Sequence, residues 1–142
     1  MKKYTAWLKT AAIFQILNAL MHVPSLFFSP PPNNDTEKQL FTLMDTYRFK
    51  FGAGVEHTMT EMTLVFSACL SLLCLLGGLL NWYLLSKKTE PEIMKGVVTI
   101  NLFVFGILFI LTVAFTFLIP VISIGLISVF LLLARVSIAR VK

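Results

Sequence analysis

Charged residues are scarce in this chain: only 13% of its 142 residues are charged, whereas 57% are hydrophobic. A soluble domain usually contains about 25% charged residues, so the composition argues against an ordinary soluble protein. Cysteine is also rare, with Cys69 and Cys74 five positions apart in an apolar segment. On a helix, residues at this spacing point in different directions. The spacing therefore excludes a Cys-x-x-Cys redox pair and a cysteine-based zinc site.

Common catalytic patterns are missing as well. There is no Ser/His/Asp or Cys/His set at a plausible depth, and Gly52-Ala53-Gly54 has no Walker or dinucleotide-binding pattern around it. Histidine occurs only at His22 and His57, and no acidic residue follows Glu92. The last two apolar segments therefore lack the titratable groups that a proton relay across a membrane would need.

Four long apolar segments dominate the chain, over roughly residues 10–28, 62–85, 96–118 and 121–139. A helix needs about 20 residues to cross the hydrocarbon core of a bilayer. Residues 96–139 as one helix would be about 65 Å long, twice that thickness, so we expect them to fold back near Pro120. Little chain remains outside these segments. We predict a single domain over residues 1–142, with an all-α fold: an integral membrane four-helix bundle.

The net charge of +5 carries information about topology. Basic residues flank the spans at both chain ends and between spans two and three: Lys2, Lys3, Lys9, Lys87, Lys88, Lys95, Arg135, Arg140 and Lys142. Because positive charge marks the cytoplasmic side, we predict cytoplasmic termini, in a bacterial inner membrane, and no nucleic-acid partner. The Met21-His22-Val23-Pro24 sequence is a poor cleavage site, so the first segment is expected to be an uncleaved span.

A short amphipathic helix is predicted on the outer side, between spans one and two. The run Ser29-Pro30-Pro31-Pro32-Asn33-Asn34 cannot continue a helix. Thr36 and Gln39 then form a capping-box pattern, and apolar residues recur at helical spacing through Phe51. Gly52-Ala53-Gly54 is expected to end this helix and to begin span two.

Polar side chains inside the first two spans mark the candidate site. Gln15, Asn18 and His22 are spaced i, i+3, i+7 and share one helix face, while His57 and Glu61 are spaced i, i+4 on the next span. With span two beginning near residue 55, His22 and Glu61 would each lie about 9 Å below the outer ends of their helices. Titratable groups at such depth usually face a cavity or the bundle interior.

Three interpretations of this cluster remain open. In the first, the role is structural: the side chains hydrogen-bond one another and fix the packing of two helices, with Asn18, His22 and Glu61 as the partners. Alternatively, Asn18, His22, His57 and Glu61 would line a pocket for a hydrophobic or amphipathic, lipid-like ligand beneath the outer helix. In the third, His22, His57 and Glu61 would hold a metal ion.

The functional prediction is a small membrane protein that contacts membrane lipid and binds such a ligand in an outer-leaflet pocket. The alternatives are an accessory subunit of a larger membrane complex, or an enzyme with His57 and Glu61 as its catalytic acid–base pair. A homo-oligomer is also open, and no cofactor is assigned.

Short motifs resemble those of small bacterial four-span membrane proteins of unknown function, of about the size of DoxX-like proteins. The motifs are Met21-His22-Val23-Pro24, Phe51-Gly52-Ala53-Gly54 and Phe117-Leu118-Ile119-Pro120. The resemblance implies a four-helix membrane fold, and it does not indicate an activity. The segment from His57 to Glu61 is also similar to the His-x-x-x-Glu of the emopamil-binding sterol isomerases. That family has a further carboxylate on a later helix, which this chain lacks after Glu92.

Overall fold

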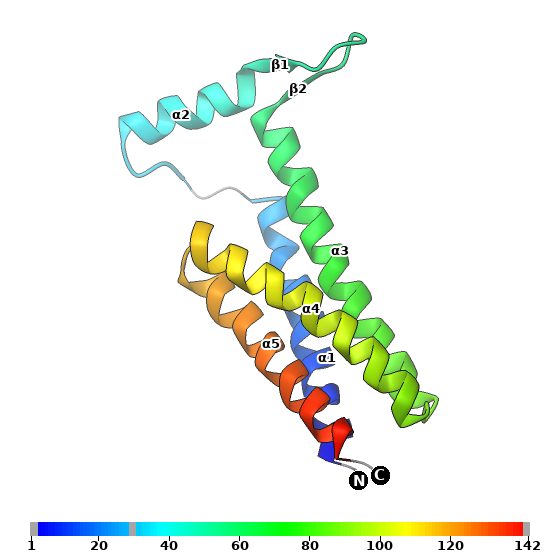
Figure 1. The fold of residues 1–142 in the computed structure, drawn as a ribbon. Coiled ribbons are helices and arrows are strands. Elements are labelled where there is room, and N and C mark those ends of the chain that lie inside the picture. Colours follow the sequence, from blue (N-terminus) through cyan, green and yellow to red (C-terminus); the bar gives the residue numbers. More distant parts are fainter. Residues whose placement is uncertain (1–2, 29–30, 141–142) are drawn as a thin grey trace. The chain divides into compact units, whose positions relative to one another are not determined.

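The computed structural model describes residues 3–28 and 31–140, and most of them are helical (Figure 1). Lys2, Ser29, Pro30 and Lys142, which enter the predictions above, lie outside these ranges. The elements are α1 (Lys3–His22), the 3-10 turn η1 (Pro24–Leu26), α2 (Asp35–Thr46), β1 (Arg48–Lys50), β2 (Glu56–Thr58), α3 (Met59–Ser86), α4 (Pro91–Phe115) and α5 (Leu118–Ala139). The helical fold class is as predicted, apart from the small β1–β2 sheet.

Three helices, α3, α4 and α5, are long and apolar enough to cross a membrane. They contain nearly all of the predicted second, third and fourth spans. The predicted first span is not in this set: α1 stops at His22, and its 20 residues include two lysines and two buried amides. The described residues thus support an integral membrane protein with three such helices, and a fourth crossing stays a prediction.

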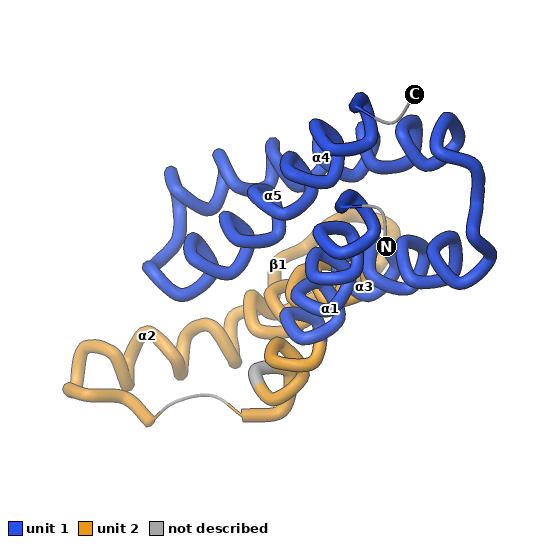
Figure 2. The backbone as a smooth tube through the Cα atoms, turned by 90° about the horizontal axis from the view of Figure 1, so that it is seen from below, with its two compact units in different colours: residues 1–19, 73–142 blue, residues 20–72 orange. Residues whose placement is uncertain are grey.

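The chain divides into two compact units, which Figure 2 shows in different colours. Unit 1 contains residues 1–19 and 73–142, and unit 2 contains residues 20–72. In unit 1, each helix buries one face: the buried residues of α5 are Ile124, Ile127, Leu131, Ala134 and Ile138, and those of α4 are Met94, Val98, Asn101, Phe105 and Thr112. These spacings of three, four and seven are those of one helical face.

Small residues let the helices of unit 1 approach closely. A Cβ atom on Gly78 of α3 would lie 2.7 Å from Cγ1 of Ile16 and 3.0 Å from the carbonyl oxygen of Ala12, both on α1. A Cβ atom on Gly125 of α5 would lie 2.9 Å from the Phe109 ring of α4. These contacts leave no room for a side chain, as is typical of helix pairs packed through glycine.

The turn between α4 and α5 lies slightly earlier than predicted. Helix α4 ends at Phe115, and Thr116 closes it, with its backbone N–H donating to the carbonyl oxygen of Thr112 at 3.0 Å. Pro120 was predicted to break the helix, but it occupies the first turn of α5. A proline is tolerated there because the N–H groups of a first turn have no intrahelical acceptor.

In unit 2, α2 forms where an outer helix was predicted, but it begins earlier and ends earlier. Its N-cap is Asn34, whose side chain accepts the backbone N–H of Glu37 at 2.9 Å, so the predicted Thr36–Gln39 capping box is wrong. The helix ends at Thr46 and does not reach Phe51. Glu37 in turn accepts the N–H of Asn33 at 2.7 Å, which fixes the chain leading into the helix.

Residues 48–58 form an antiparallel β-hairpin that the sequence patterns did not predict. Phe49 pairs with His57 in its register, and the backbone of Phe51 donates to Val55 at 3.0 Å. The turn contains three consecutive residues with positive φ, at Gly52 (86°), Ala53 (51°) and Gly54 (77°). Glycine adopts this conformation at little cost, so Gly52-Ala53-Gly54 makes a hairpin turn and not the start of span two.

Candidate functional site

The N-terminus of α3 places the predicted pair His57 and Glu61. The helix begins at Met59, so His57 is the middle residue of strand β2 and not a helical residue. The capping residue is Thr58: its hydroxyl accepts the backbone N–H of Glu61 at 3.2 Å, and the Glu61 carboxylate accepts the N–H of Thr58 at 3.0 Å. This reciprocal pair is a capping box. Glu61 therefore satisfies backbone groups in the first turn of α3.

The two predicted catalytic candidates do meet. Nδ1 of His57 lies 3.0 Å from Oε2 of Glu61, the same oxygen that accepts the Thr58 N–H. Both side chains are about half exposed, at 53% and 50%. With Met62, Val65, Phe66, Thr60 and Leu64 they line a hollow of about 430 Å³. Every described residue of the lining is between positions 57 and 66, so this hollow is a groove along a single stretch of chain.

A larger cavity, here called the α2 cavity, opens on the adjacent face of α3 and has a volume of about 770 Å³. Thr60 and Leu64 line both the groove and this cavity, so the two share a border. The described residues around it come from three parts of unit 2: residues 26–28 together with 31 and 32, the C-terminal half of α2, and the first turns of α3. Its lining residues are Leu26, Phe27, Phe28, Pro31, Pro32, Phe41, Met44, Asp45, Thr60, Thr63, Leu64 and Ser67.

The walls of the α2 cavity differ in chemistry. Thr60, Thr63 and Ser67 are spaced i, i+3, i+7 on α3 and bring three hydroxyl groups to one wall. The Thr60 hydroxyl donates to the carboxylate of Asp45 in the last turn of α2. Aromatic, proline and aliphatic side chains make up the rest of the lining. The cavity thus offers one carboxylate and several hydroxyls beside a large apolar surface.

His22 is the last residue of α1 and is half-buried. It is not among the described residues that line the α2 cavity or the groove. Among residues 3–28 and 31–140, no group of three His, Cys, Asp or Glu side chains is placed to hold a metal ion. The set of His22, His57 and Glu61 is therefore not assembled as a metal site.

Asn18 belongs to unit 1, where it takes part in helix packing. It is 7% exposed, and its amide nitrogen lies 3.3 Å from the sulfur of Cys74 on α3. The packing interpretation expected Asn18 to bond with His22 and Glu61. Its partner in the structure is Cys74, and Cys69 lies exposed on another face of α3, as the five-residue spacing predicted.

Gln15 connects three helices of unit 1 through buried amides. Asn81 of α3 donates to Oε1 of Gln15 at 3.0 Å, and Gln15 donates to Oδ1 of Asn101 on α4 at 3.4 Å. Asn101 then donates to the backbone carbonyl of Val97 at 3.2 Å. Among the buried side chains that the structure describes, only Asn81 has an oxygen, Oδ1, without a hydrogen-bond partner. Asn81, Gln15 and Asn101 are called the amide row below. Its one acceptor without a partner is the Oδ1 atom of Asn81.

Sequence reasoning missed the polar wall of the α2 cavity because hydroxyl side chains are common at helix surfaces. The usable signal was the i, i+3, i+7 spacing of Thr60, Thr63 and Ser67. It also missed the Thr58-Met59-Thr60-Glu61 capping box, which fits the Thr-x-x-Glu pattern and fixes the start of α3. The amide row was visible only in part, because nothing in the sequence pairs Gln15 with Asn81 and Asn101.

No protein-family model, curated protein or solved structure matches this chain. The resemblance to four-span membrane proteins therefore stays a prediction, and the functional proposals below depend on the geometry of the chain.

Proposed function

We propose that this protein is a small integral membrane protein that binds an amphipathic molecule in the α2 cavity. The observation that carries the proposal is the cavity's division into a wall with a carboxylate and hydroxyls and a wall of aromatic and aliphatic side chains. Ligand pockets of roughly 300–1,000 Å³ commonly combine an apolar lining with a few polar groups that orient the ligand. The volume of about 770 Å³ falls in this range.

Asp45 supports a preference for one class of head group. It is the only charged residue among the described residues that line the α2 cavity. A carboxylate accepts hydrogen bonds and attracts cations, so a ligand with an ammonium group near Asp45 and an alkyl chain along the Phe28 and Phe41 side would match both walls. Anionic amphiphiles would place like charge beside Asp45.

The outer surface of α2 supports a location at the membrane boundary. The helix has no buried residue, and Leu40 and Leu43 on its apolar face are 51% and 58% exposed. An amphipathic helix of this kind binds a membrane surface through its apolar face. We place α2 on the outer side of a bacterial inner membrane, with cytoplasmic termini and α1 as a fourth span, in line with the positive charge at residues 87, 88 and 95.

Photo-crosslinking tests the proposal. The full chain in nanodiscs of neutral lipid is exposed to a long-chain alkylamine that carries a diazirine, and the labelled peptides are mapped by mass spectrometry. We expect saturable labelling of peptides that contain Met44 and Ser67. Asp45→Asn should weaken binding of the amine by about tenfold, because hydrogen bonds to charged groups contribute roughly 1.5–3 kcal/mol.

Two comparisons make the result specific. Asp35→Asn removes the same charge from the first turn of α2, outside the cavity, and should leave labelling unchanged. An alkyl carboxylate of equal length should label the cavity weakly. Labelling spread evenly over the lipid-facing helices, or equal affinity in wild type and Asp45→Asn, would refute the proposal.

A further inference from the structure

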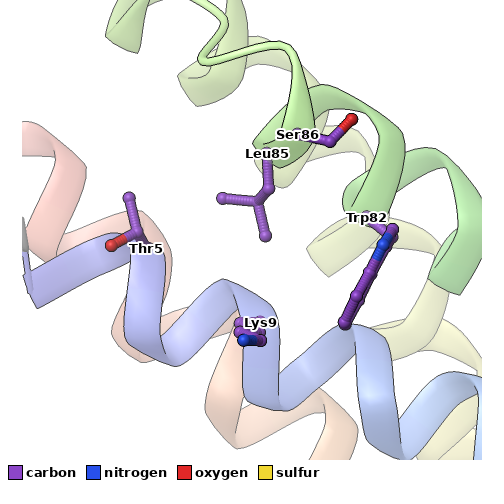
Figure 3. A pocket seen from close by; sticks show the side chains of 5 residues that line it. All are labelled: Thr5, Lys9, Trp82, Leu85 and Ser86. Atoms are coloured by element: carbon purple, nitrogen blue, oxygen red, sulfur yellow. The ribbon is translucent and has the colours of Figure 1, made fainter.

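A second cavity lies in unit 1, between the N-terminal part of α1 and the C-terminal end of α3 (Figure 3). We call it the Lys9–Trp82 pocket. It has a volume of about 320 Å³, and its lining residues are Thr5, Lys9, Trp82, Leu85 and Ser86. Among the residues that the structure describes, none lines both this pocket and the α2 cavity. Its chemistry is different as well, because its charged residue is a lysine.

Lys9 and Trp82 form the centre of this pocket. The ammonium nitrogen of Lys9 lies 5.5 Å from the centre of the Trp82 ring, within the range of a cation–π interaction. Both side chains are exposed, and Trp82 keeps 45% of its surface accessible. The ring therefore holds the ammonium group at the pocket without neutralising it, since a π face carries no net charge.

The other lining residues make the pocket amphipathic. Figure 3 shows the side chains of Trp82 and Leu85 extending from α3 toward α1, where they form an apolar surface. The Ser86 hydroxyl donates to the carbonyl oxygen of Tyr83 at 2.7 Å, so its proton is already used. Lys9 is the only charged residue among the described residues of the lining, and its ammonium group can pair with an anion. No acidic residue lines the pocket among the residues that the structure describes.

The surrounding sequence strengthens the positive charge at this end of the helices. Lys87 and Lys88 directly follow α3, and the ammonium of Lys87 lies 5.6 Å from the centre of the Tyr83 ring. Glu90 is the N-cap of α4 and Glu92 lies in its first turn, and both oppose part of this charge. A tryptophan, a tyrosine and several lysines at a helix end are the residues that face lipid head groups at a membrane surface.

We propose that the Lys9–Trp82 pocket binds the head group of an anionic phospholipid. The lipid phosphate would pair with the ammonium of Lys9, and the glycerol and the first carbons of the chains would lie against Trp82 and Leu85. Basic pockets between spanning helices recognise anionic head groups in this way. A volume of about 320 Å³ holds a head group and not a whole lipid, so the acyl chains remain in the bilayer beside α3.

The two tryptophans of the chain permit a direct test. Trp7 stacks on Phe130, with ring centres 6.1 Å apart, and does not line the pocket. The full-length Trp7→Phe variant therefore reports fluorescence from Trp82 alone. It is reconstituted in phosphatidylcholine vesicles with a small fraction of brominated phosphatidylglycerol, or with the same fraction of brominated phosphatidylcholine. We expect the anionic lipid to quench Trp82 with about fivefold higher apparent affinity, the effect of one lysine near a membrane surface.

Matched variants in the Trp7→Phe background identify the residue responsible. Lys9→Gln should abolish the preference for phosphatidylglycerol, and Lys9→Arg should keep it, which also shows that the pocket folds. Lys95→Gln removes a charge from α4 outside the pocket and should have no effect. Equal quenching by both lipids in the Trp7→Phe protein, or equal losses in Lys9→Gln and Lys95→Gln, would overturn the proposal. Full competition by millimolar inorganic phosphate would also overturn it, since the ligand would then be a free anion.

Discussion

Thr58 and Glu61 exchange two hydrogen bonds at the start of α3: the Thr58 N–H donates to the Glu61 carboxylate at 3.0 Å, and the Glu61 N–H donates to the Thr58 hydroxyl at 3.2 Å. This exchange gives Glu61 a structural task that is independent of any ligand. His57 adds a second contact to the same carboxylate, through Nδ1 at 3.0 Å. The stability of any Glu61 variant must therefore be measured before a change in its ligand binding is interpreted.

Loss of the cap should destabilise the protein measurably. Thr58→Ala removes the hydroxyl acceptor and should lower the free energy of unfolding by about 0.5–2 kcal/mol. Glu61→Ala should have a similar effect, whereas Glu61→Gln keeps a side-chain oxygen for the Thr58 N–H and should be nearly neutral. Thermal unfolding in mild detergent, followed by circular dichroism, checks this. A Glu61→Gln variant as unstable as Glu61→Ala would show that the carboxylate charge, and not the cap, is what matters.

The close approach of α1 and α3 should make Gly78 intolerant of a side chain. Gly78→Ala would place its Cβ 3.0 Å from the carbonyl oxygen of Ala12, and such overpacking typically costs about 1–3 kcal/mol. Gly106 of α4 is the matched control, because a Cβ there meets no described atom within 4 Å. Gly106→Ala should cause no loss of stability, since alanine favours helix more than glycine does. Equal melting temperatures for the two variants would contradict the packing described for α1 and α3.

The buried amides should show coupled energetics. A double-mutant cycle with Gln15→Ala and Asn81→Ala is expected to give a coupling energy of about 0.6 kcal/mol, the average for hydrogen bonds between membrane helices. Unfolding in detergent with a denaturing surfactant measures each corner of the cycle. Gln15→Ala combined with Thr99→Ala serves as the control, because Thr99 bonds instead to Arg135 at 2.7 Å. Additivity in the first cycle would show that the bond from Asn81 to Gln15 contributes nothing.

The hairpin turn should respond in opposite ways to two small changes. Gly52 has φ of 86°, so Gly52→Ala should destabilise the turn by about 1 kcal/mol or more. Ala53 has φ of 51°, and Ala53→Gly should relieve a strain of about 1 kcal/mol. The N–H of Phe51 donates to the carbonyl of Val55, and the N–H of Val55 donates to the carbonyl of Gly52. Hydrogen exchange at these two amides should become faster in the first variant and slower in the second. The same direction of change in both would argue against this turn.

The approximate positions of α3, α4 and α5 followed from the sequence, because a long apolar segment in lipid must satisfy its backbone hydrogen bonds internally and therefore forms a helix. The ends of α3, α4 and α5 lie within about five residues of the ends of the predicted spans. The start of α3 was misplaced because residues 55–58 were read as helix. Phe49, His57 and their neighbours show no long alternating pattern, and a three-residue strand is too short for periodicity to reveal.

The residues that line the α2 cavity are not the residues predicted to line a pocket. The sequence predicts a pocket beneath an outer amphipathic helix, and in unit 2 the residues Phe41, Met44 and Asp45 of α2 line a cavity. Its polar wall, however, comes from Asp45, Thr60, Thr63 and Ser67, whereas the predicted lining was Asn18, His22, His57 and Glu61. Polar residues are rare in an apolar sequence and therefore stand out as site candidates, but Glu61 takes part in a capping box and Asn18 donates to Cys74. Which residues line the cavity depends on contacts between α2, α3 and residues 26–28, and residue type alone does not reveal these contacts.

The hydrogen bonds of Gln15 to Asn81 and Asn101 also bear on the order in which the helices pack during synthesis. Gln15 bonds to Asn81 and Asn101, which follow it by 66 and 86 positions. At ribosomal rates of about 5–20 residues per second, α1 is synthesised on the order of ten seconds before its second partner exists. An amide without hydrogen-bond partners in hydrocarbon is costly. We therefore expect newly synthesised α1 to stay at the membrane–water boundary until α3 and α4 have been made. The helix that is synthesised first would then be the last one to pack.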